Sequence, residues 1–401
     1  MLGSFNLDKT YQILLITLAF LMPLTVFGGN LVVVIICLLW IFSGGYKSKI
    51  HEIINNKLMI ASIAFFTLHV IGLAWTEDLN WGLHIVHKMW YFIGLFPILF
   101  TIVKKDYIKY YVAAFLLAIA VTEIFSYLVW FEVIPQFKNA TVRNPTPFMS
   151  HISYNPILAF AIYLVLHEVF FNNDLGKSKF FLYSFFAITM IFNMFITGGR
   201  AGQVMFFAML LVLIFQFFNY EKIKSLFFTL ILIPGIFFIA YQSSQLFEVR
   251  VNSAINDIVT YEVQSNTSVG KRINYMLNSW DIIKKNPLIG VGTGDFPSEF
   301  KQNSITNINR EYTTSTNPHN MYNLVFVQLG LVGIISFLLI FYYQIKQSFS
   351  SSSRFIRDVG ITMPLLFLVI MFADSYLLGH YTTLMYVFFS SFLYKDFEKS
   401  K

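Results

Sequence analysis

Long apolar runs recur along the whole chain, and this feature limits the possible folds more than any other. An α-helix needs about 20 apolar residues to cross roughly 30 Å of hydrocarbon. Only 12% of the 401 residues are charged and 56% are hydrophobic, whereas a soluble domain carries roughly 25% charged residues. The sequence therefore predicts an all-α polytopic membrane protein with about twelve transmembrane helices.

The predicted spans fall into two groups separated by one long polar stretch. The spans are 11–27, 30–43, 58–75, 88–103, 110–133, 151–171, 179–197, 202–219, 224–241, 318–345, 360–377 and 379–394. We therefore divide a single membrane domain into residues 1–241 with the first nine spans, a loop at 242–317, and residues 318–401 with the last three spans and a short tail.

The distribution of Lys and Arg predicts how the chain is oriented in the membrane. Every second short loop is basic, whereas the segment Trp75–Asp78 is acidic. Because basic loops stay in the cytoplasm, both termini are expected there, and the loop 242–317 is expected on the opposite side. The net charge of +7 is thus explained by basic loops that stay in the cytoplasm next to the membrane lipids. No basic stretch with interleaved aromatic residues indicates a nucleic-acid partner.

The long loop contains a pattern typical of an amphipathic helix over about 271–285. Asn286 and Pro287 are expected to end this helix, and a flexible turn with three glycines follows. Its apolar face should rest on the membrane domain or on the lipid interface. The apolar positions at three- and four-residue steps are Ile273, Met276, Leu277, Trp280 and Ile283.

A histidine stands where the tenth span begins. Pro318 suits the first position of a helix and Asn317 suits its cap, so His319 is expected in the first turn. Nine residues separate Asn320 from Gly330, and Gly333 stands three positions after Gly330. Small residues at this spacing let another helix approach closely, which would fix the end that carries the histidine.

Two arginines are expected on the same side of the membrane as His319. Arg200 follows Thr197-Gly198-Gly199 at the end of the seventh span, and Arg272 lies in the first turn of the amphipathic helix. The alternative interpretation of Arg200 is a snorkelling arginine that reaches the lipid headgroups. For Arg272 it is an ordinary solvated charge in a loop. Together they suit a polyanionic, lipid-linked donor, because guanidinium groups clamp phosphates and a histidine can accept a proton from an attacking hydroxyl.

The sequence offers no sign of a metal or a nucleotide cofactor. No His, Cys, Asp or Glu cluster has metal-ligand spacing, and no phosphate-binding loop for ATP is present. The single cysteine, Cys37, lies in an apolar run and is interpreted as a small buried hydrophobe. Energy for a reaction would have to come from the donor itself.

The segments that contain Arg200, Arg272 and His319 resemble the O-antigen ligase family of bacterial lipopolysaccharide assembly. The family signature is His, then Asn, Ser or Gln, then nine residues, then Gly-x-x-Gly, and residues 319–333 satisfy it in full. The segments that end at Arg200 and at Arg272, and the segment 287–294, are also similar. The resemblance spans about 190–340 by motif, and the rest of the chain by helix count and topology.

The resemblance implies a twelve-helix glycosyltransferase in the bacterial inner membrane, with its active site in the periplasm and no cofactor. Such enzymes move a glycan from undecaprenyl diphosphate to lipid A-core. By the resemblance, Arg200 and Arg272 bind the diphosphate, and His319 activates the acceptor or stabilises charge. Lys88 joins the phosphate site, and Asn320 belongs to the signature and is assigned to substrate binding.

Other polar residues are weaker candidates. Arg143 is expected to touch the donor glycan, with an exposed loop cation as the alternative. His151 and Asn155 open the sixth span and could line a cavity or cap the helix. Asp374 and Glu123 lie inside apolar runs, where a carboxylate either serves function or pairs with a neighbouring helix.

Three rival functions share part of this pattern. An O-antigen polymerase uses the same donor, but the spacing of Arg, ten residues and Gly often cited for polymerases is absent from the outer-face arginines. A protein O-oligosaccharyltransferase commonly carries a longer C-terminal region than the few residues after 394. A glycan exporter, the non-enzyme alternative, would need charges along a transmembrane path.

Overall fold

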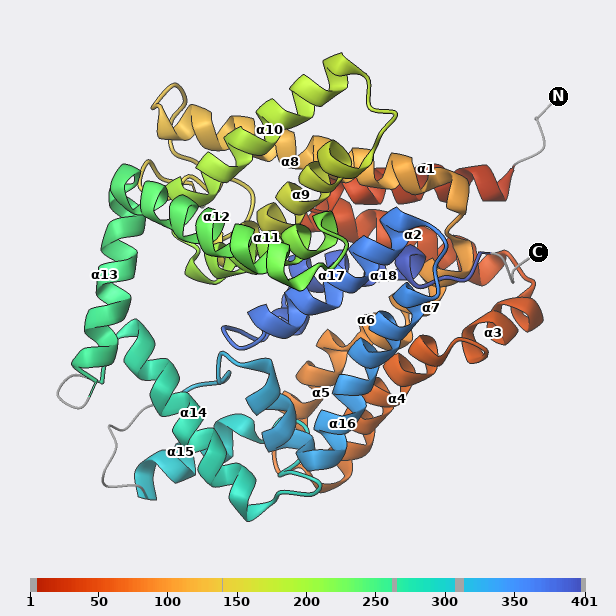
Figure 1. Ribbon diagram of the computed structural model, residues 1–401. Coiled ribbons are helices and arrows are strands. Elements are labelled where there is room, and N and C mark those ends of the chain that lie inside the picture. Colours follow the sequence, from red (N-terminus) through yellow and green to blue (C-terminus); the bar gives the residue numbers. More distant parts are fainter. Residues whose placement is uncertain (1–5, 139, 262–264, 307–313, 398–401) are drawn as a thin grey trace. The chain divides into compact units, whose positions relative to one another are not determined.

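The computed structural model (Figure 1) describes residues 6–138, 140–261, 265–306 and 314–397. The regular elements among these residues are all helices. The part described contains no strand, only an isolated bridge between Thr141 and Asn144. The chain divides into two compact units, the first formed by 1–15, 30–108 and 254–401, and the second by 16–29 and 109–253.

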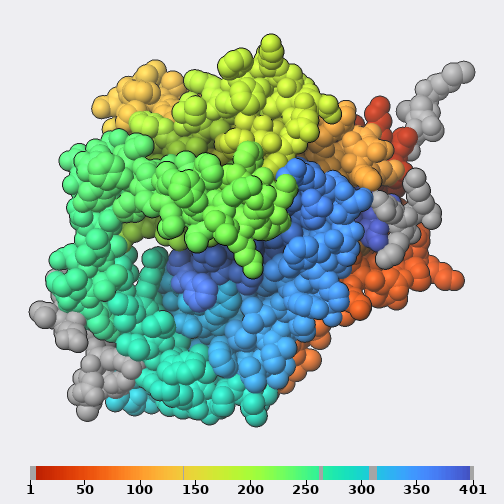
Figure 2. All heavy atoms as spheres, in the orientation of Figure 1, coloured from red at the N-terminus to blue at the C-terminus, as the bar shows by residue number. Residues whose placement is uncertain are grey.

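The first unit contains the helices from both ends of the chain. Its elements are α3 (Tyr46–Ile54), α4 (Lys57–Ile71), η1 (Gly72–Trp75), α5 (Leu79–Lys88), α6 (Trp90–Ile93), α7 (Leu95–Ile102), η2 (Lys105–Tyr107), α14 (Ser268–Lys285), α15 (Phe296–Thr306), α16 (Met321–Phe349), α17 (Arg354–Ile370), η3 (Tyr376–Leu378) and α18 (His380–Leu393). Helix α16 packs against α4, α14 and α17, and α18 packs against α7. Helices α14 and α15 form part of the surface of this unit (Figure 2).

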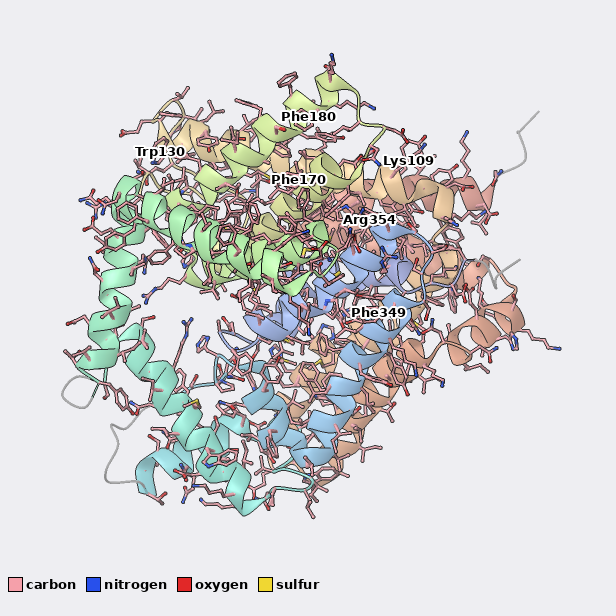
Figure 3. All side chains as sticks on the ribbon, viewed as in Figure 1. Lys109, Trp130, Phe170, Phe180, Phe349 and Arg354 are labelled. Atoms are coloured by element: carbon pink, nitrogen blue, oxygen red, sulfur yellow. The ribbon has the colours of Figure 1, made fainter. Side chains whose placement is uncertain are left out.

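The second unit is built around one long buried helix. Its elements are α8 (Ile108–Trp130), α9 (His151–Phe171), α10 (Lys177–Ile196), α11 (Arg200–Phe217) and α12 (Lys222–Ser243), while α1 (Leu7–Leu21), α2 (Val26–Phe42) and α13 (Gln245–Val259) contribute to both units. Helix α9 packs against α10 and α11, and α12 packs against α11. Exposed aromatic side chains such as Phe170 and Phe180 (Figure 3) suit a surface covered by lipid.

Each of the twelve predicted spans contains helix, but the count of twelve is not confirmed. Among the described residues, seven helices are long and apolar enough to cross a membrane, and two bent helix pairs would raise the number to nine. The first pair is α2 with α3, bent by 114°, and the second joins α5 to Trp90–Ile102 at 47°. Helices α1, α17 and α18 have only 15, 17 and 14 residues, which is short for a full crossing.

The stretch predicted as a long loop contains more helix than expected. The amphipathic helix is confirmed as α14, which begins three residues earlier than predicted and is capped at its end by Asn286. Helices α13 and α15 lie on either side of it. Neither helix was predicted. A helical period is nevertheless present in α13, where Phe247, Val251, Ala254, Ile255 and Ile258 recur at three- and four-residue steps, whereas α15 has few large apolar residues.

A loop inserts into a break in α16, and this corrects two expectations. The glycine turn after α14 was expected to be flexible, and Gly330 was expected to face another helix. Instead the backbone of 287–292 is hydrogen-bonded to both sides of the break. Val291 and Gly292 donate to the carbonyls of Val327 and Gln328, and Leu331 and Val332 donate to those of Pro287 and Leu288, at 2.9–3.2 Å.

Gly330 makes this insertion possible. Its φ of 61° and ψ of −156° lie in a region that is essentially restricted to glycine. A Cβ at this position would come within 2.3 Å of the Leu288 carbonyl carbon. The broken turn of α16 therefore exchanges its own hydrogen bonds for bonds to the loop, which satisfies backbone groups that would otherwise be costly to leave unpaired.

Candidate active site

His319 lies just before α16, so the expected start of the helix was wrong. The cap is Asn320, whose side chain accepts a hydrogen bond from the Asn323 N–H at 3.0 Å. The Asn317 side chain instead accepts from the His319 N–H at 3.0 Å. This local turn competes with helix formation, and it holds His319 at a φ of 49°, a left-handed conformation that histidine tolerates better than most residues.

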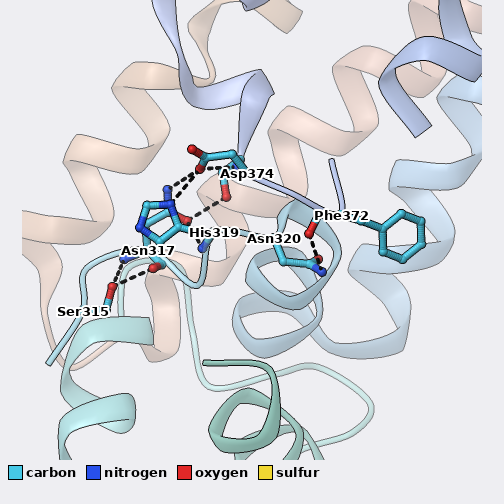
Figure 4. Close-up of polar contacts among 7 residues, drawn as sticks. Ser315, Asn317, His319, Asn320, Phe372 and Asp374 are labelled. Carbon is cyan, nitrogen blue, oxygen red and sulfur yellow. Dashed lines mark hydrogen bonds and ion pairs between the residues drawn. The ribbon is translucent and has the colours of Figure 1, made fainter. Parts of the chain in front are cut away.

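Asp374 is the partner of His319 (Figure 4). The imidazole Nδ1 lies 3.2 Å from the Asp374 Oδ1. The same oxygen accepts from the Ser375 N–H at 2.7 Å, and the Ser375 hydroxyl donates to the Asn317 Oδ1 at 2.8 Å. The segment before α16 and the segment after α17 are thus joined by a network of hydrogen bonds.

This network fixes the chemistry that the imidazole can perform. An ionised carboxylate only accepts hydrogen bonds, so Nδ1 must carry the proton and Nε2 is left as a base. The His319 side chain is 41% exposed, while that of Asp374 is 16% exposed. The arrangement therefore presents a basic nitrogen to the surroundings and keeps the orienting carboxylate behind it.

Helix α14 brings an aromatic ring and a cation to the same place. The Tyr275 ring stacks on the His319 ring with centroids 5.9 Å apart and an interplanar angle of 20°. Arg272 is one turn earlier on α14, in the second turn and not in the first as predicted. Residues three positions apart are neighbours on a helix surface, so Arg272 is on the side of α14 that carries Tyr275.

Asp295 fixes the loop that reaches α16. Its buried carboxylate accepts hydrogen bonds from the Thr76 hydroxyl at 2.6 Å and from the Glu77 and Asp78 N–H groups at 2.9 Å. These bonds join the loop to the segment before α5. Lys88 is the last residue of α5 and is half-buried. Among the described residues it makes no hydrogen bond or ion pair with the His319 network.

The second unit holds the other predicted residues in a separate polar network. The Asn144 side chain accepts from the Gly198 N–H at 2.9 Å and lies 2.9 Å from the His151 Nδ1. The Thr197 hydroxyl donates to the Asn155 side chain at 2.9 Å. His151 is the first residue of α9, so it lies at a helix start as predicted.

Arg200 is the first residue of α11, and two more arginines belong to the same unit. Arg143 is exposed beside Asn144. The Arg250 guanidinium lies over Gly198, only 3.3 Å from where a Cβ would stand. Gly202 lets α11 approach α9, because a Cβ there would be 2.2 Å from the Asn155 Cβ. This close contact fixes the helix that begins with Arg200.

Several of these residues were missed in the sequence. Tyr275 stands three positions after Arg272 and could have been found as its neighbour on one helix face. Ser375 follows Asp374, but no spacing rule pairs it with His319. Arg250 carries no sequence signal for its contact with Gly198. No group of three or more potential metal ligands occurs in the described ranges.

The fold and this network define a multi-pass α-helical membrane protein with a histidine and carboxylate pair, and with an arginine on the helix whose Tyr275 ring stacks on that histidine. Residues 185–338 match the family model described as O-Antigen ligase. The chain therefore carries a domain of the O-antigen ligase family, of the ligase and polymerase type, whose members are glycosyltransferase-like enzymes. The match includes Arg200, Arg272 and His319. The curated proteins that were compared yielded no match.

Proposed function

We propose that this protein transfers O-antigen or a related glycan from undecaprenyl diphosphate to lipid A-core at the periplasmic face of the inner membrane. The observation that carries this proposal is the hydrogen bond between His319 and Asp374, with Tyr275 stacked on the imidazole and Arg272 three residues earlier on the same helix. An oriented imidazole suits the activation of a sugar hydroxyl, and a guanidinium suits a diphosphate.

In the proposed reaction, His319 Nε2 accepts the proton of the acceptor hydroxyl. The hydroxyl oxygen then forms a bond to the anomeric carbon of the donor, and the bond from that carbon to the phosphate oxygen breaks. The lipid diphosphate leaves with the bonding electrons, and its charge is stabilised by arginine. Direct displacement of this kind inverts the anomeric carbon. A glycosyl-enzyme trapped during turnover would contradict it.

By the family resemblance, the donor diphosphate is assigned to Arg272 and Arg200. Lys88 is assigned to the same phosphates, Arg143 to the donor glycan, and His151 to substrate binding. The support for Arg200, Arg272 and Lys88 is the family resemblance, with the position of Arg272 three residues before Tyr275 on α14 as additional support. Asn320 caps α16 through its side chain, so its contribution to binding would come through the position of His319.

The test is a deletion strain complemented with variants. Loss of the gene should remove capped lipopolysaccharide and cause long lipid-linked glycan to accumulate. His319→Ala should fail to restore capping while inserting into the membrane at the wild-type level. His51→Ala, an exposed histidine on α3, is the matched control and should restore capping.

The deletion strain also distinguishes the rival functions. Lipopolysaccharide that carries a single repeat unit in the deletion strain would identify a polymerase. Loss of glycan from proteins with normal lipopolysaccharide would identify a protein O-oligosaccharyltransferase. Glycan retained in the cytoplasmic leaflet would identify an exporter. Full capping by His319→Ala would remove this histidine from the mechanism.

A further inference from the structure

Helix α14 turns one apolar stripe to the outside, while Ile282 and Ile283 near its end are buried. Met276 and Trp280 are 50% and 52% exposed, and Ile273 and Leu277 are partly exposed on the same side. Of the five apolar positions that predict this helix, only Ile283 is buried. A helix on the surface of a soluble domain turns its apolar stripe toward the core, so this orientation needs a cause.

The buried side of α14 is rich in polar side chains that are hydrogen-bonded inside the unit. The Asn303 amide of α15 donates to the Asn278 side chain at 2.9 Å, and the Tyr261 hydroxyl donates to that of Asn274 at 2.7 Å. These bonds fix the rotation of α14 about its axis. The apolar side is therefore held outward and is not free to turn into the core.

This apolar side leads directly onto a membrane span. After α14 the chain passes through Leu288 and Ile289, which are both exposed. Their loop is hydrogen-bonded into the break of α16, where Leu331, Val332 and Ile335 are also exposed. Helix α16 is among the helices long and apolar enough to cross a membrane. The apolar surface thus continues from the span to the loop that leaves α14.

Cations lie at the edge of the apolar side. The Lys284 ammonium is 6.0 Å from the centre of the Trp280 ring, and Lys271 and Lys285 are exposed at the two ends of the helix. Tryptophan and lysine together are typical of the membrane–water boundary, where the ring lies among the headgroups and the lysine reaches their phosphates.

We propose that α14 lies in the membrane–water interface, with Ile273, Met276, Leu277 and Trp280 in the boundary between headgroups and acyl chains. The occupant of this surface is bilayer phospholipid. Arg272 and Tyr275 are on the same helix, so the interface also sets the height of these side chains at the level of lipid phosphates. This placement does not depend on the transfer reaction.

The test measures the depth of spin labels on the full-length protein in vesicles of phosphatidylethanolamine and phosphatidylglycerol. In a Cys37→Ser background, single labels are attached through Met276→Cys and Trp280→Cys. Lys301→Cys, at an exposed position on α15, is the reference for water, and Ile335→Cys is the reference for hydrocarbon. Collision rates with oxygen and with a water-soluble nickel chelate give the depth of each label.

We expect the labels at 276 and 280 to be mobile and at least threefold more accessible to oxygen, relative to nickel, than the label at 301. Their depth should fall between the references at 301 and 335. Nickel accessibility equal to that at 301 would place the helix in water. Immobile labels shielded from both reagents would show that a protein, or a second copy of this chain, covers the surface. Either result overturns the proposal, and neither bears on glycan transfer.

Discussion

At the scale of single residues, Asp374 has the clearest expected role. It holds the imidazole of His319 through a bond of 3.2 Å and is expected to act as a positioning residue. Asp374→Asn should lower kcat for transfer by about 100-fold or more, because the amide no longer requires the proton on Nδ1. The KM for the donor should change little, and steady-state kinetics of the reconstituted protein would measure both constants.

A double-mutant cycle separates this role from a structural one. If Asp374 acts through His319, adding Asp374→Asn to His319→Ala should cause no further loss of activity. Additive losses would show that Asp374 has an independent role.

Arg272 is expected to bind phosphate by shape as well as by charge. Arg272→Lys keeps the positive charge but loses the planar pair of donors. We expect the KM for the lipid-linked donor to rise about tenfold, as one good charge-assisted bond is lost. Lys301→Arg, at a basic residue exposed on α15, is the control. An unchanged KM in Arg272→Lys would mean that charge alone is sufficient.

At the scale of elements, the break in α16 depends on Gly330. Gly330→Ala should destabilise the fold by about 3 kcal/mol or more, because a Cβ adds backbone strain and a clash with the loop. Gly235→Ala on α12, where a Cβ would meet nothing within 4 Å, should be neutral or slightly stabilising. Thermal unfolding in detergent compares the two variants, and equal midpoints would contradict the role given to the break.

Helix α15 carries a carboxyl group whose ionisation opposes folding. Burial raises the pKa of Glu299, and the charges of Glu77 and Asp295 raise it further, while Lys285 lowers it. The pKa of Glu299 is therefore higher in the folded than in the unfolded protein, so the protonated carboxyl favours the fold at low pH. This stabilisation is lost as the pH rises through the folded-state pKa.

Glu299→Gln should therefore raise the unfolding midpoint at pH 7. It should leave the midpoint nearly unchanged near pH 4, where the Glu299 carboxyl of the wild type is itself largely protonated and neutral. Glu248→Gln, at an exposed position on α13, serves as the control. Thermal unfolding at the two pH values provides the measurement. A lower midpoint for Glu299→Gln at pH 7 would show that the ionised carboxylate stabilises the fold.

At the scale of the whole molecule, the orientation in the membrane is the main expectation from charge. In a Cys37→Ser background, Ser298→Cys on α15 should react with an impermeant maleimide in intact, outer-membrane-permeabilised cells. Ser48→Cys on α3 should react only after lysis, because basic loops stay in the cytoplasm. Both positions are exposed, so a reversed pattern would reverse the predicted topology.

Much of this protein could be predicted from its sequence, because lipid imposes a strong rule. Backbone groups in hydrocarbon must bond within a helix, so apolar runs alone located helix in every predicted span. The period of three and four residues located α14, and the short motifs pointed to His319, Arg200 and Arg272. The match at 185–338 confirmed the family that those motifs resemble.

Only the tertiary structure decided the partners of these residues. Asp374 is 55 residues from His319, and no local pattern pairs them. The loop at 287–292 enters α16 because Gly330 can adopt a conformation that side chains forbid, which a sequence shows only as a small residue. The apolar side of α14 faces outward because Asn274 and Asn278 find partners inside. Sequence thus determined the local periodicity and the class of protein, whereas long-range hydrogen bonds determined the site, since they join segments whose separation along the chain carries no signal.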